Sequence, residues 1–279
     1  MGMEGIWFTE LETPGLVLGL KLKKVIHQEK TSYQSLAIVE TEVYGKALIL
    51  DETVQTTLGD EYFYHEMIVH VPLHTHPFPQ RILVIGGGDG GSIREVVKYP
   101  QVKEAVLVEI DERVVVNALE HLPELSSGLK DPRVKIVFAD GISYVAEQEE
   151  AFDVIIVDST DPIGPAAGLF SPEFYRNVFK ALAPEGIFVS QTGSPLFAQE
   201  LLKKIHKELR TIFPITRLYL TTVPTYPGGW WSFTLGSKKH DPLEVNHGQS
   251  RVPTRFYTPA IHRGAFNLPP FIKEFLNEG

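Results

Sequence analysis

The chain has 279 residues, of which 43% are hydrophobic, and a mean hydropathy of −0.03, so one or two globular domains with a sizeable core are expected. It contains no cysteine, which excludes disulfides, thiolate nucleophiles and zinc sites built on cysteine. The formal charge of −9 disfavours nucleic acid as a partner, because contact with a phosphate backbone needs a basic face.

The first residues and the apolar runs of the chain indicate no secretory or membrane role. Residues 1–15 are acidic and lack the basic region followed by an apolar region that makes a signal peptide. No apolar run approaches the roughly 18 residues that are needed to span a bilayer. We therefore expect a cytoplasmic protein with no membrane partner.

Residues 5 to about 60 have the composition of strands. The segment 33–51, YQSLAIVETEVYGKALILD, contains β-branched and apolar runs that are broken by the turn-forming residues YGK. This pattern favours antiparallel hairpins. We expect a small N-terminal antiparallel β domain over residues 1–60.

From residue 81 the pattern changes to strands that alternate with helices. Strands are expected at 81–86, 104–111, 134–140, 152–158, 186–191, 215–223 and 230–236. Helices are expected at 91–99, 172–185 and 197–213, with Pro172 near the start of the second and Gly186 after its end. The alternation predicts an α/β fold, in which a doubly wound, Rossmann-like sheet over residues 61–279 is covered by helices on both faces.

Acidic residues follow the predicted strands. Asp89, Glu109, Asp140 and Asp158 each lie at or just past the C-terminal end of one strand. In an open parallel sheet, ligands bind beyond these strand ends, along a shared edge. The four carboxylates are therefore expected to converge on one site.

The glycine-rich turn GGGDGG, residues 86–91, follows the first of these strands and opens a helix. Glycines there, such as Gly86 and Gly88, let the backbone pass close to a bound nucleotide or nucleoside. Glu109, after the next strand, can accept hydrogen bonds from both ribose hydroxyls. Asp89 would repel a pyrophosphate, which favours a positively charged nucleoside such as an S-adenosyl compound.

The same acids distinguish two S-adenosyl compounds. Asp89 and Asp158 would oppose the carboxylate of S-adenosylmethionine, whereas decarboxylated S-adenosylmethionine carries only an ammonium group there. This favours the decarboxylated compound as co-substrate and aminopropyl as the transferred group. A methyltransferase that uses S-adenosylmethionine on the same fold remains an alternative, as does a non-catalytic polyamine-binding protein.

Seven short motifs span most of the chain. They are YHEM at 64–67, GGGDGG at 86–91, VEID at 108–111, DPRV at 131–134, ADG at 139–141, DSTDPIGPA at 158–166 and PTYPGGWWSF at 224–233. In content and order they resemble the spermidine synthases, the polyamine aminopropyltransferases. The resemblance implies a Rossmann-like domain of the methyltransferase type and a homodimer or homotetramer. It also implies aminopropyl transfer to putrescine, with spermidine and methylthioadenosine as products.

The resemblance further implies which residues hold the nucleoside. Gln34 is expected near the thioether and Glu109 at the ribose. The residues expected around the adenine are Asp140, Gly141 and Pro165.

For the amines, the resemblance implies a proton acceptor and a lined channel. Asp158 is expected to accept the proton of the attacking amine, helped by Tyr64. The residues expected around the aminopropyl and polyamine chains are His65, Asp89, Asp161, Tyr64, Tyr226 and Trp231.

One position leaves the acceptor amine open. Some members of the family have an acid where this chain has Gly193, and that acid helps to anchor the far amine of putrescine. Without it the far end of the site is expected to be roomier. Cadaverine, agmatine or a longer polyamine therefore remains an alternative acceptor.

A metal ion is not expected. In the segment 65–76, HEMIVHVPLHTH, His65 and His70 are five residues apart, one more than in the zinc-protease helix motif. They would face different sides of a helix. His74 and His76 are expected in a Pro-rich connector.

Overall fold

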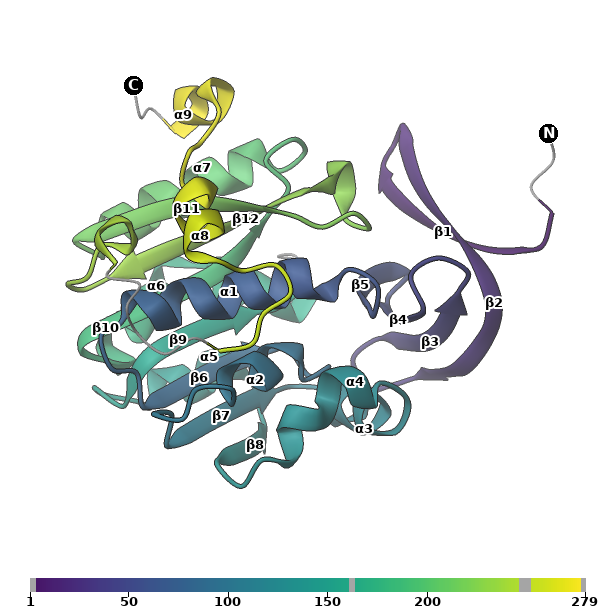
Figure 1. The fold of residues 1–279 in the computed structure, drawn as a ribbon, viewed down its shortest axis with the longest axis horizontal. Helices are drawn as coiled ribbons and strands as arrows, with labels where there is room; N and C mark the ends of the chain where they lie inside the picture. The colour runs from purple at the N-terminus through teal and green to yellow at the C-terminus, as the bar shows by residue number, and fades with distance from the viewer. Residues whose placement is uncertain (1–3, 161–163, 246–251, 277–279) are drawn as a thin grey trace.

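Two β-sheets organise the chain in the computed structural model, which describes residues 4–160, 164–245 and 252–276 (Figure 1). The N-terminal sheet is an antiparallel meander of five strands, each paired with the next along the chain. They are β1 (Ile6–Thr13), β2 (Leu16–Lys30), β3 (Ser35–Thr41), β4 (Lys46–Leu50) and β5 (Thr53–Thr57). The turn predicted at YGK joins β3 to β4, which agrees with the expected hairpins.

The second sheet has seven strands in the order β11-β12-β10-β9-β6-β7-β8. The parallel strands are β6 (Arg81–Gly86), β7 (Glu104–Glu109), β8 (Val134–Phe138), β9 (Phe152–Asp158) and β10 (Leu182–Gly193). At one edge, β12 (Trp230–Ser237) and β11 (Ile215–Thr222) are antiparallel. The strand order reverses between β6 and β9, the place where doubly wound sheets bind ligands. The predicted Rossmann-like fold with an N-terminal antiparallel β domain is confirmed.

Helices cover both faces of the second sheet (Figure 1). Along β6, Ile82 and Val84 pack on the side of α1 (Glu61–Thr75) and α2 (Gly91–Val96), whereas Leu83 and Ile85 face the opposite layer. That layer contains α5 (Gly141–Ala146), α6 (Pro172–Ala181) and α7 (Gln199–Arg210). Strands that are buried on both faces explain the near-continuous apolar runs in the sequence.

Shorter helices complete the described structure. After β7 come α3 (Glu112–His121), α4 (Pro123–Ser126) and η1 (Ser127–Lys130), and near the C-terminus come α8 (Pro259–Ala265) and α9 (Pro270–Leu276). The other short 3-10 helices are η2 (Gly164–Phe170), η3 (Pro227–Gly229) and η4 (Pro242–Glu244).

The N-terminal sheet packs against α3 and α4. Leu36 and Leu48 of the sheet share a buried cluster with Val114, Leu122 and Leu125. Residues of β4 and β5 and the C-terminal ends of β6, β7 and β9 consequently line one cavity.

We propose that the domains divide between residues 60 and 61. β5 ends at Thr57 and α1 begins at Glu61, so the connection is short. Asp60 fixes it on both sides, because its carboxylate accepts hydrogen bonds from Thr57 Oγ1 (2.6 Å) and Thr225 Oγ1 (2.8 Å).

Three helices are shorter than the sequence pattern predicts. The helix expected at 172–185 ends at Ala181, and Gly186 lies inside β10 rather than after a helix. Pro184 disfavours helical backbone at the residue before it, and Leu182 is already extended, with φ −75° and ψ 137°. The helices expected at 91–99 and 197–213 are α2 and α7, which end at Val96 and Arg210.

The Pro-rich connector expected around His74 is instead the end of α1. This helix continues past Pro72 to Thr75, so His74 lies in its last turn and His76 caps it. α1 is buried along most of its length, and this packing outweighs the cost of a proline inside a helix. Of the helices in the described ranges, none is long and apolar enough to cross a membrane.

Candidate active site

A cavity of about 420 Å³ lies between the N-terminal sheet and the C-terminal ends of the parallel strands. Its volume falls within the range of small-molecule sites. Asp89, Glu109, Asp140 and Asp158 all line it. The prediction that the four acids share one edge of the sheet is confirmed.

Asp158 is held by two hydroxyl groups. Tyr64 Oη donates to its Oδ1 at 2.8 Å, and Ser92 Oγ donates to its Oδ2 at 2.6 Å. Burial raises the pKa of Tyr64 well above its ordinary value, and Asp158 adds to the rise, so the phenol remains a donor. A carboxylate has about four acceptor positions, so Asp158 can still accept a proton or a further hydrogen bond.

The glycine turn brings the backbone against Asp158. Gly86 pairs with Asp158 across β6 and β9 and has a φ of +76°, a conformation that favours glycine. A Cβ at Gly86 would lie 2.3 Å from the Asp158 carbonyl oxygen. Gly86 and Gly88 both line the cavity.

Backbone groups hold the acids at the end of the cavity next to β7. Asp111 N donates to Glu109 Oε1 at 2.9 Å. Burial raises the pKa of Glu109 to about 7, although backbone N–H groups around it oppose the rise. Asp140 caps α5, because Ile142 N donates to its Oδ1 at 2.9 Å, and Gly141 opens that helix. We call this region the nucleoside end.

Gln34 reaches this end from the N-terminal sheet. Its Nε2 donates to Asp111 Oδ2 at 2.9 Å, and Thr31 Oγ1 donates to the same oxygen at 2.7 Å. Asp111 therefore ties the loop before β3 to the second domain, and Gln34 lines the same cavity as Glu109.

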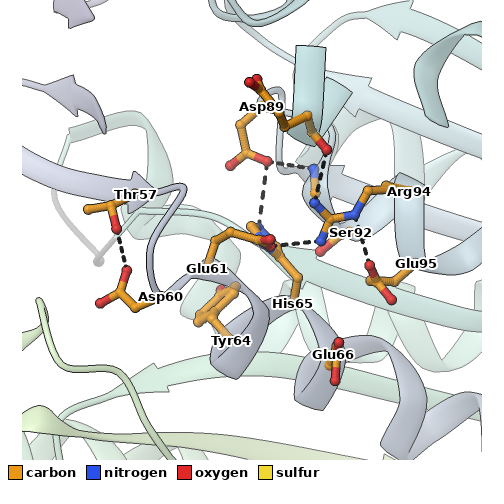
Figure 2. Close-up of polar contacts among 12 residues, drawn as sticks. Thr57, Asp60, Glu61, Tyr64, His65, Glu66, Asp89, Ser92, Arg94 and Glu95 are labelled. Carbon is orange, nitrogen blue, oxygen red and sulfur yellow. Dashed lines mark hydrogen bonds and ion pairs between the residues drawn. The ribbon is translucent and has the colours of Figure 1, made fainter. Parts of the chain in front are cut away.

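The opposite region, around Asp158, Asp89 and His65, is the amine end. Asp89 Oδ1 accepts a hydrogen bond from Gly91 N at 2.6 Å and lies 3.6 Å from His65 Nε2. Figure 2 shows His65 between Asp89 and Glu61. Burial raises the pKa of Asp89, His65 opposes that rise, and Asp158 adds to it.

Aromatic side chains form the wall next to Asp158. The rings of Tyr226 and Trp231 have centroids 4.7 Å apart, and those of Tyr64 and Tyr226 are 5.9 Å apart. Tyr226 Oη also donates to the carbonyl oxygen of Gln55. Trp231 is buried in the wall, whereas Trp230 points away and stacks on Phe271.

Three positions from the sequence analysis are not among the described residues that line the cavity. Asp161 lies outside the described residues, and of Pro165 only the backbone, in η2, is described. Gly193 is not among the residues that line the cavity. Its φ of +85° gives glycine a conformational reason at this position, and the roomier far end stays a prediction.

Family models decide the relationship of the chain to known proteins. A model of the spermine/spermidine synthase domain matches residues 61–246, and a model of the spermidine synthase tetramerisation domain matches residues 6–57. The chain belongs to the spermine/spermidine synthase family. Aminopropyl transfer is accordingly its class of reaction. The identities of the donor nucleoside and of the acceptor amine are the subject of the proposed function.

Relatives in the family cover nearly the whole chain. A polyamine aminopropyltransferase of Moorella thermoacetica is 62% identical over 275 residues, which cover 98% of this chain and 97% of the relative. A polyamine aminopropyltransferase of Desulforudis audaxviator is 52% identical over 270 residues, which cover 96% of this chain and 98% of the relative.

Solved structures of the family have the same fold. A spermidine synthase in complex with the transition state analogue AdoDATO has a TM-score of 0.95 and 38% identity, over 99% of this chain and 97% of that one. Spermidine synthase from Thermotoga maritima has a TM-score of 0.93 and 38% identity, over 99% and 96%.

The cavity also contains residues that the sequence patterns did not indicate. Glu10 of β1 is buried, its Oε2 accepts a hydrogen bond from Val54 N at 2.7 Å, and it lines the cavity. Gln191 lines it too, and its Nε2 donates to the Ser159 carbonyl oxygen at 3.1 Å. Ser92 is not in the lining but holds Asp158, and its place in the first turn after the glycine loop could have suggested it. Nothing local marks Glu10.

A metal centre is not evident in the described ranges. Within residues 4–160, 164–245 and 252–276, no group of three or more His, Asp or Glu side chains is arranged to hold a metal ion.

Proposed function

We propose that this chain transfers the aminopropyl group of decarboxylated S-adenosylmethionine to putrescine, giving spermidine and methylthioadenosine. The observation that carries the proposal is the arrangement of acids in the cavity of this chain, which belongs to the family. Glu109 and Asp140 lie at one end of the cavity, and Asp89 and Asp158 lie at the other. The substrates bring a sulfonium and ammonium groups to the amine end, where carboxylates stabilise them.

In this proposal the donor lies across the switch point of the sheet. Glu109 accepts hydrogen bonds from both ribose hydroxyls. Asp140, Gly141 and Pro165 surround the adenine, and Gln34 lies near the thioether sulfur. The aminopropyl ammonium points toward Asp89, and His65 lies beside it.

The transfer begins with loss of a proton from the acceptor. A primary ammonium has a pKa of about 10.4, so at pH 7 only about 1 molecule in 10³ is unprotonated. Asp158 accepts the proton while Tyr64 and Ser92 hold its carboxylate in place. The amine lone pair then attacks the carbon bonded to the sulfonium. The new N–C bond forms, the C–S bond breaks with its electron pair passing to sulfur, and neutral methylthioadenosine leaves.

We assign the far ammonium of the acceptor to Glu10. Glu10 binds the backbone of Val54, and the next residue, Gln55, accepts a hydrogen bond from Tyr226. Tyr226 packs against Trp231, so one continuous wall runs from Glu10 toward the reacting amine. In this arrangement Tyr226 and Trp231 face the methylene chain of the acceptor amine. The assignment of Asp161 to the channel remains a prediction.

We also propose a homotetramer located in the cytoplasm. The family model that matches residues 6–57 is named for the tetramerisation of spermidine synthase. Large apolar side chains of the first two strands are exposed, including Ile6 (61%), Leu11 (71%) and Val17 (55%). Contacts with further copies of the chain would cover them. The cytoplasmic location rests on the sequence features alone.

The function is tested by incubating the purified enzyme with decarboxylated S-adenosylmethionine and one amine at a time. The panel is putrescine, cadaverine, agmatine and spermidine, and mass spectrometry detects methylthioadenosine and the product. We expect the highest kcat/KM with putrescine, and no methylated amine when S-adenosylmethionine replaces the donor. No methylthioadenosine with any amine would overturn the function, whereas a better amine would change only the acceptor.

The same panel of amines tests whether Glu10 binds the far ammonium of the acceptor. Glu10→Gln keeps an oxygen for Val54 N but loses the charge. We expect the KM for putrescine to rise about tenfold or more, with little change in the KM for the donor, because a charged hydrogen bond is lost only at the acceptor. An unchanged KM for putrescine would remove Glu10 from this role.

A further inference from the structure

A row of charged side chains, all buried except the half-buried Arg94, leads from the amine end into the protein between α1 and α2 (Figure 2). His65 Nε2 lies 3.6 Å from Asp89 Oδ1, and His65 Nδ1 lies 2.7 Å from Glu61 Oε2. Arg94 Nη2 donates to the same Glu61 oxygen at 2.8 Å, and Arg94 Nε donates to Glu95 Oε1 at 2.8 Å. With His65 protonated, the charges alternate in sign from Asp89 to Glu95.

The inner end of this row is anchored. The side chain of Glu95 is fully buried, with His70 Nε2 at 3.0 Å and Lys98 Nζ at 2.5 Å from its Oε2. Lys98 Nζ also donates to the carbonyl oxygen of Pro253 at 2.9 Å. Arg94 is therefore held between two carboxylates whose positions are fixed.

We propose that Glu61 and Arg94 are positioning residues: Glu61 keeps His65 in one ring orientation and in its charged form, and Arg94 holds the carboxylate of Glu61 in place. His65 in turn fixes the carboxylate of Asp89 at the amine end. Neither Glu61 nor Arg94 is among the residues that line the cavity, so both act through His65.

The surroundings of His65 leave its ring little freedom. A Cβ on Gly91 would lie 2.3 Å from His65 Cε1, so the ring is packed against the start of α2. The ring of Tyr64 meets it edge to face, with centroids 5.4 Å apart. The hydrogen bond between Nδ1 and Glu61 then directs Nε2 toward Asp89.

The charged groups that face His65 come from three elements. They are Glu61 on α1, Asp89 in the turn before α2 and Asp158 at the end of β9, with Arg94 of α2 next to Glu61. Burial opposes a charge on the ring, but Asp89, Glu61 and Asp158 outweigh it and raise the pKa of His65 to about 9. Burial also opposes the charge on Glu61, yet His65 and Arg94 lower the pKa of Glu61 to about 2.

The consequence for the reaction rests on the proposed function. Gly91 N and His65 both engage Oδ1 of Asp89. Asp89 Oδ2 is then directed to the ammonium of the donor. The positive charge of His65 next to Oδ1 favours the ionised form of the Asp89 carboxylate. If His65 lost its proton, Nε2 would turn a lone pair toward Asp89 and repel it.

The charge of His65 can be measured without catalysis. Histidine labelled with ¹³C and ¹⁵N reports the protonation of each ring by NMR, and His65→Gln identifies the signal. We expect His65 to remain an imidazolium at pH 7.5. In Glu61→Gln it should titrate about two pH units lower, and in Arg94→Lys, which cannot bridge both carboxylates, the shift should be smaller and in the same direction.

The kinetic consequence is a loss that depends on pH. Relative to the wild type, kcat/KM of Glu61→Gln for the donor should fall at least tenfold at pH 8 and recover to within about threefold at pH 6, where His65 regains its proton. Loss of folding alone would lower activity equally at both values.

Glu66→Gln is the matched control, because it makes the same change on the same helix. Glu66 is buried and accepts hydrogen bonds at 2.7 Å from the backbone N–H groups of Arg255, Phe256 and Tyr257, away from His65. It should lower stability without moving the titration of His65. A neutral His65 at pH 7 in the wild type, or equal titration in Glu61→Gln, would overturn the proposal. Failure of the proposed function would appear separately, as absence of methylthioadenosine.

Discussion

The two ends of the cavity hold their carboxylates in different ways. At the nucleoside end the donors are local: Asp111 N binds Glu109, and Ile142 N and the neighbouring Ser143 Oγ bind Asp140. Each backbone donor is two residues beyond its acceptor. These contacts are set by the local turn after a strand and depend little on side chains elsewhere.

At the amine end Asp89 also accepts a backbone hydrogen bond, from Gly91 N, but the other partners are side chains from distant parts of the chain. Tyr64 of α1 and Ser92 of α2 bind Asp158, although they are 94 and 66 residues from it in sequence. His65 faces Asp89 in the same way. The charges of this end are therefore set by tertiary packing, and one substitution changes several of them.

Under the proposed function, the difference separates donor recognition at one end from proton transfer at the other. Acids fixed by the backbone suit the rigid nucleoside, whose hydroxyls and base stay the same through the reaction. Acids fixed by side-chain donors can take up and release a proton while their position is kept. Substitutions should therefore affect turnover most at the amine end and donor binding most at the nucleoside end.

The largest effect is expected from Asp158→Asn. Removing the proposed proton acceptor should lower kcat roughly 10²–10⁴-fold, the usual contribution of a positioned base, with a smaller change in the KM for the donor. Steady-state kinetics with decarboxylated S-adenosylmethionine and putrescine measure both constants.

Ser92→Ala provides the comparison for this variant. It removes one hydrogen bond and keeps the carboxylate, so kcat should fall only about tenfold or less. If Asp158→Asn turned over at nearly the wild-type rate, the contrast between the two ends would lose its basis.

A smaller effect, which depends on pH, is expected from Glu109→Gln. Because burial raises the pKa of Glu109 to about 7, the group is mostly protonated at pH 6 and ionised at pH 8. The ionised form accepts the ribose hydroxyls better, so the affinity of the wild type for the donor should rise up to about tenfold from pH 6 to 8. Isothermal titration calorimetry with the donor alone measures this change.

In Glu109→Gln the affinity should be lower at pH 8 and should change less between the two pH values. The difference between variant and wild type isolates Glu109 from the acids at the amine end. An equal pH dependence in both proteins would show that another group controls donor binding.

The positions of the acids at the strand ends were the more predictable part of the site. Asp89, Glu109, Asp140 and Asp158 could be placed on one edge because parallel strands end together there. The cap formed by Asp140 is likewise local, since an acid just before a helix binds the N–H two residues later.

The partners at the amine end could not be read from local patterns. The expectation that Tyr64 helps Asp158 came only from the family resemblance, and the row from Glu61 to Glu95 has no sequence period. Glu10 lies on a strand whose other described residues are exposed or half-buried, so its burial depends on how the strand meets the cavity. The early end of α6 depended on Pro184, whose effect the helical spacing obscured.

The selection of a positively charged nucleoside by the acids of the amine end is tested most directly by comparing two ligands on the wild-type protein. Calorimetry at pH 7.5 without amine measures the Kd of decarboxylated S-adenosylmethionine and of S-adenosylmethionine. The decarboxylated compound should bind at least about tenfold more tightly, because its competitor brings a carboxylate toward Asp89 and Asp158. Equal binding, or tighter binding of S-adenosylmethionine, would contradict this selection.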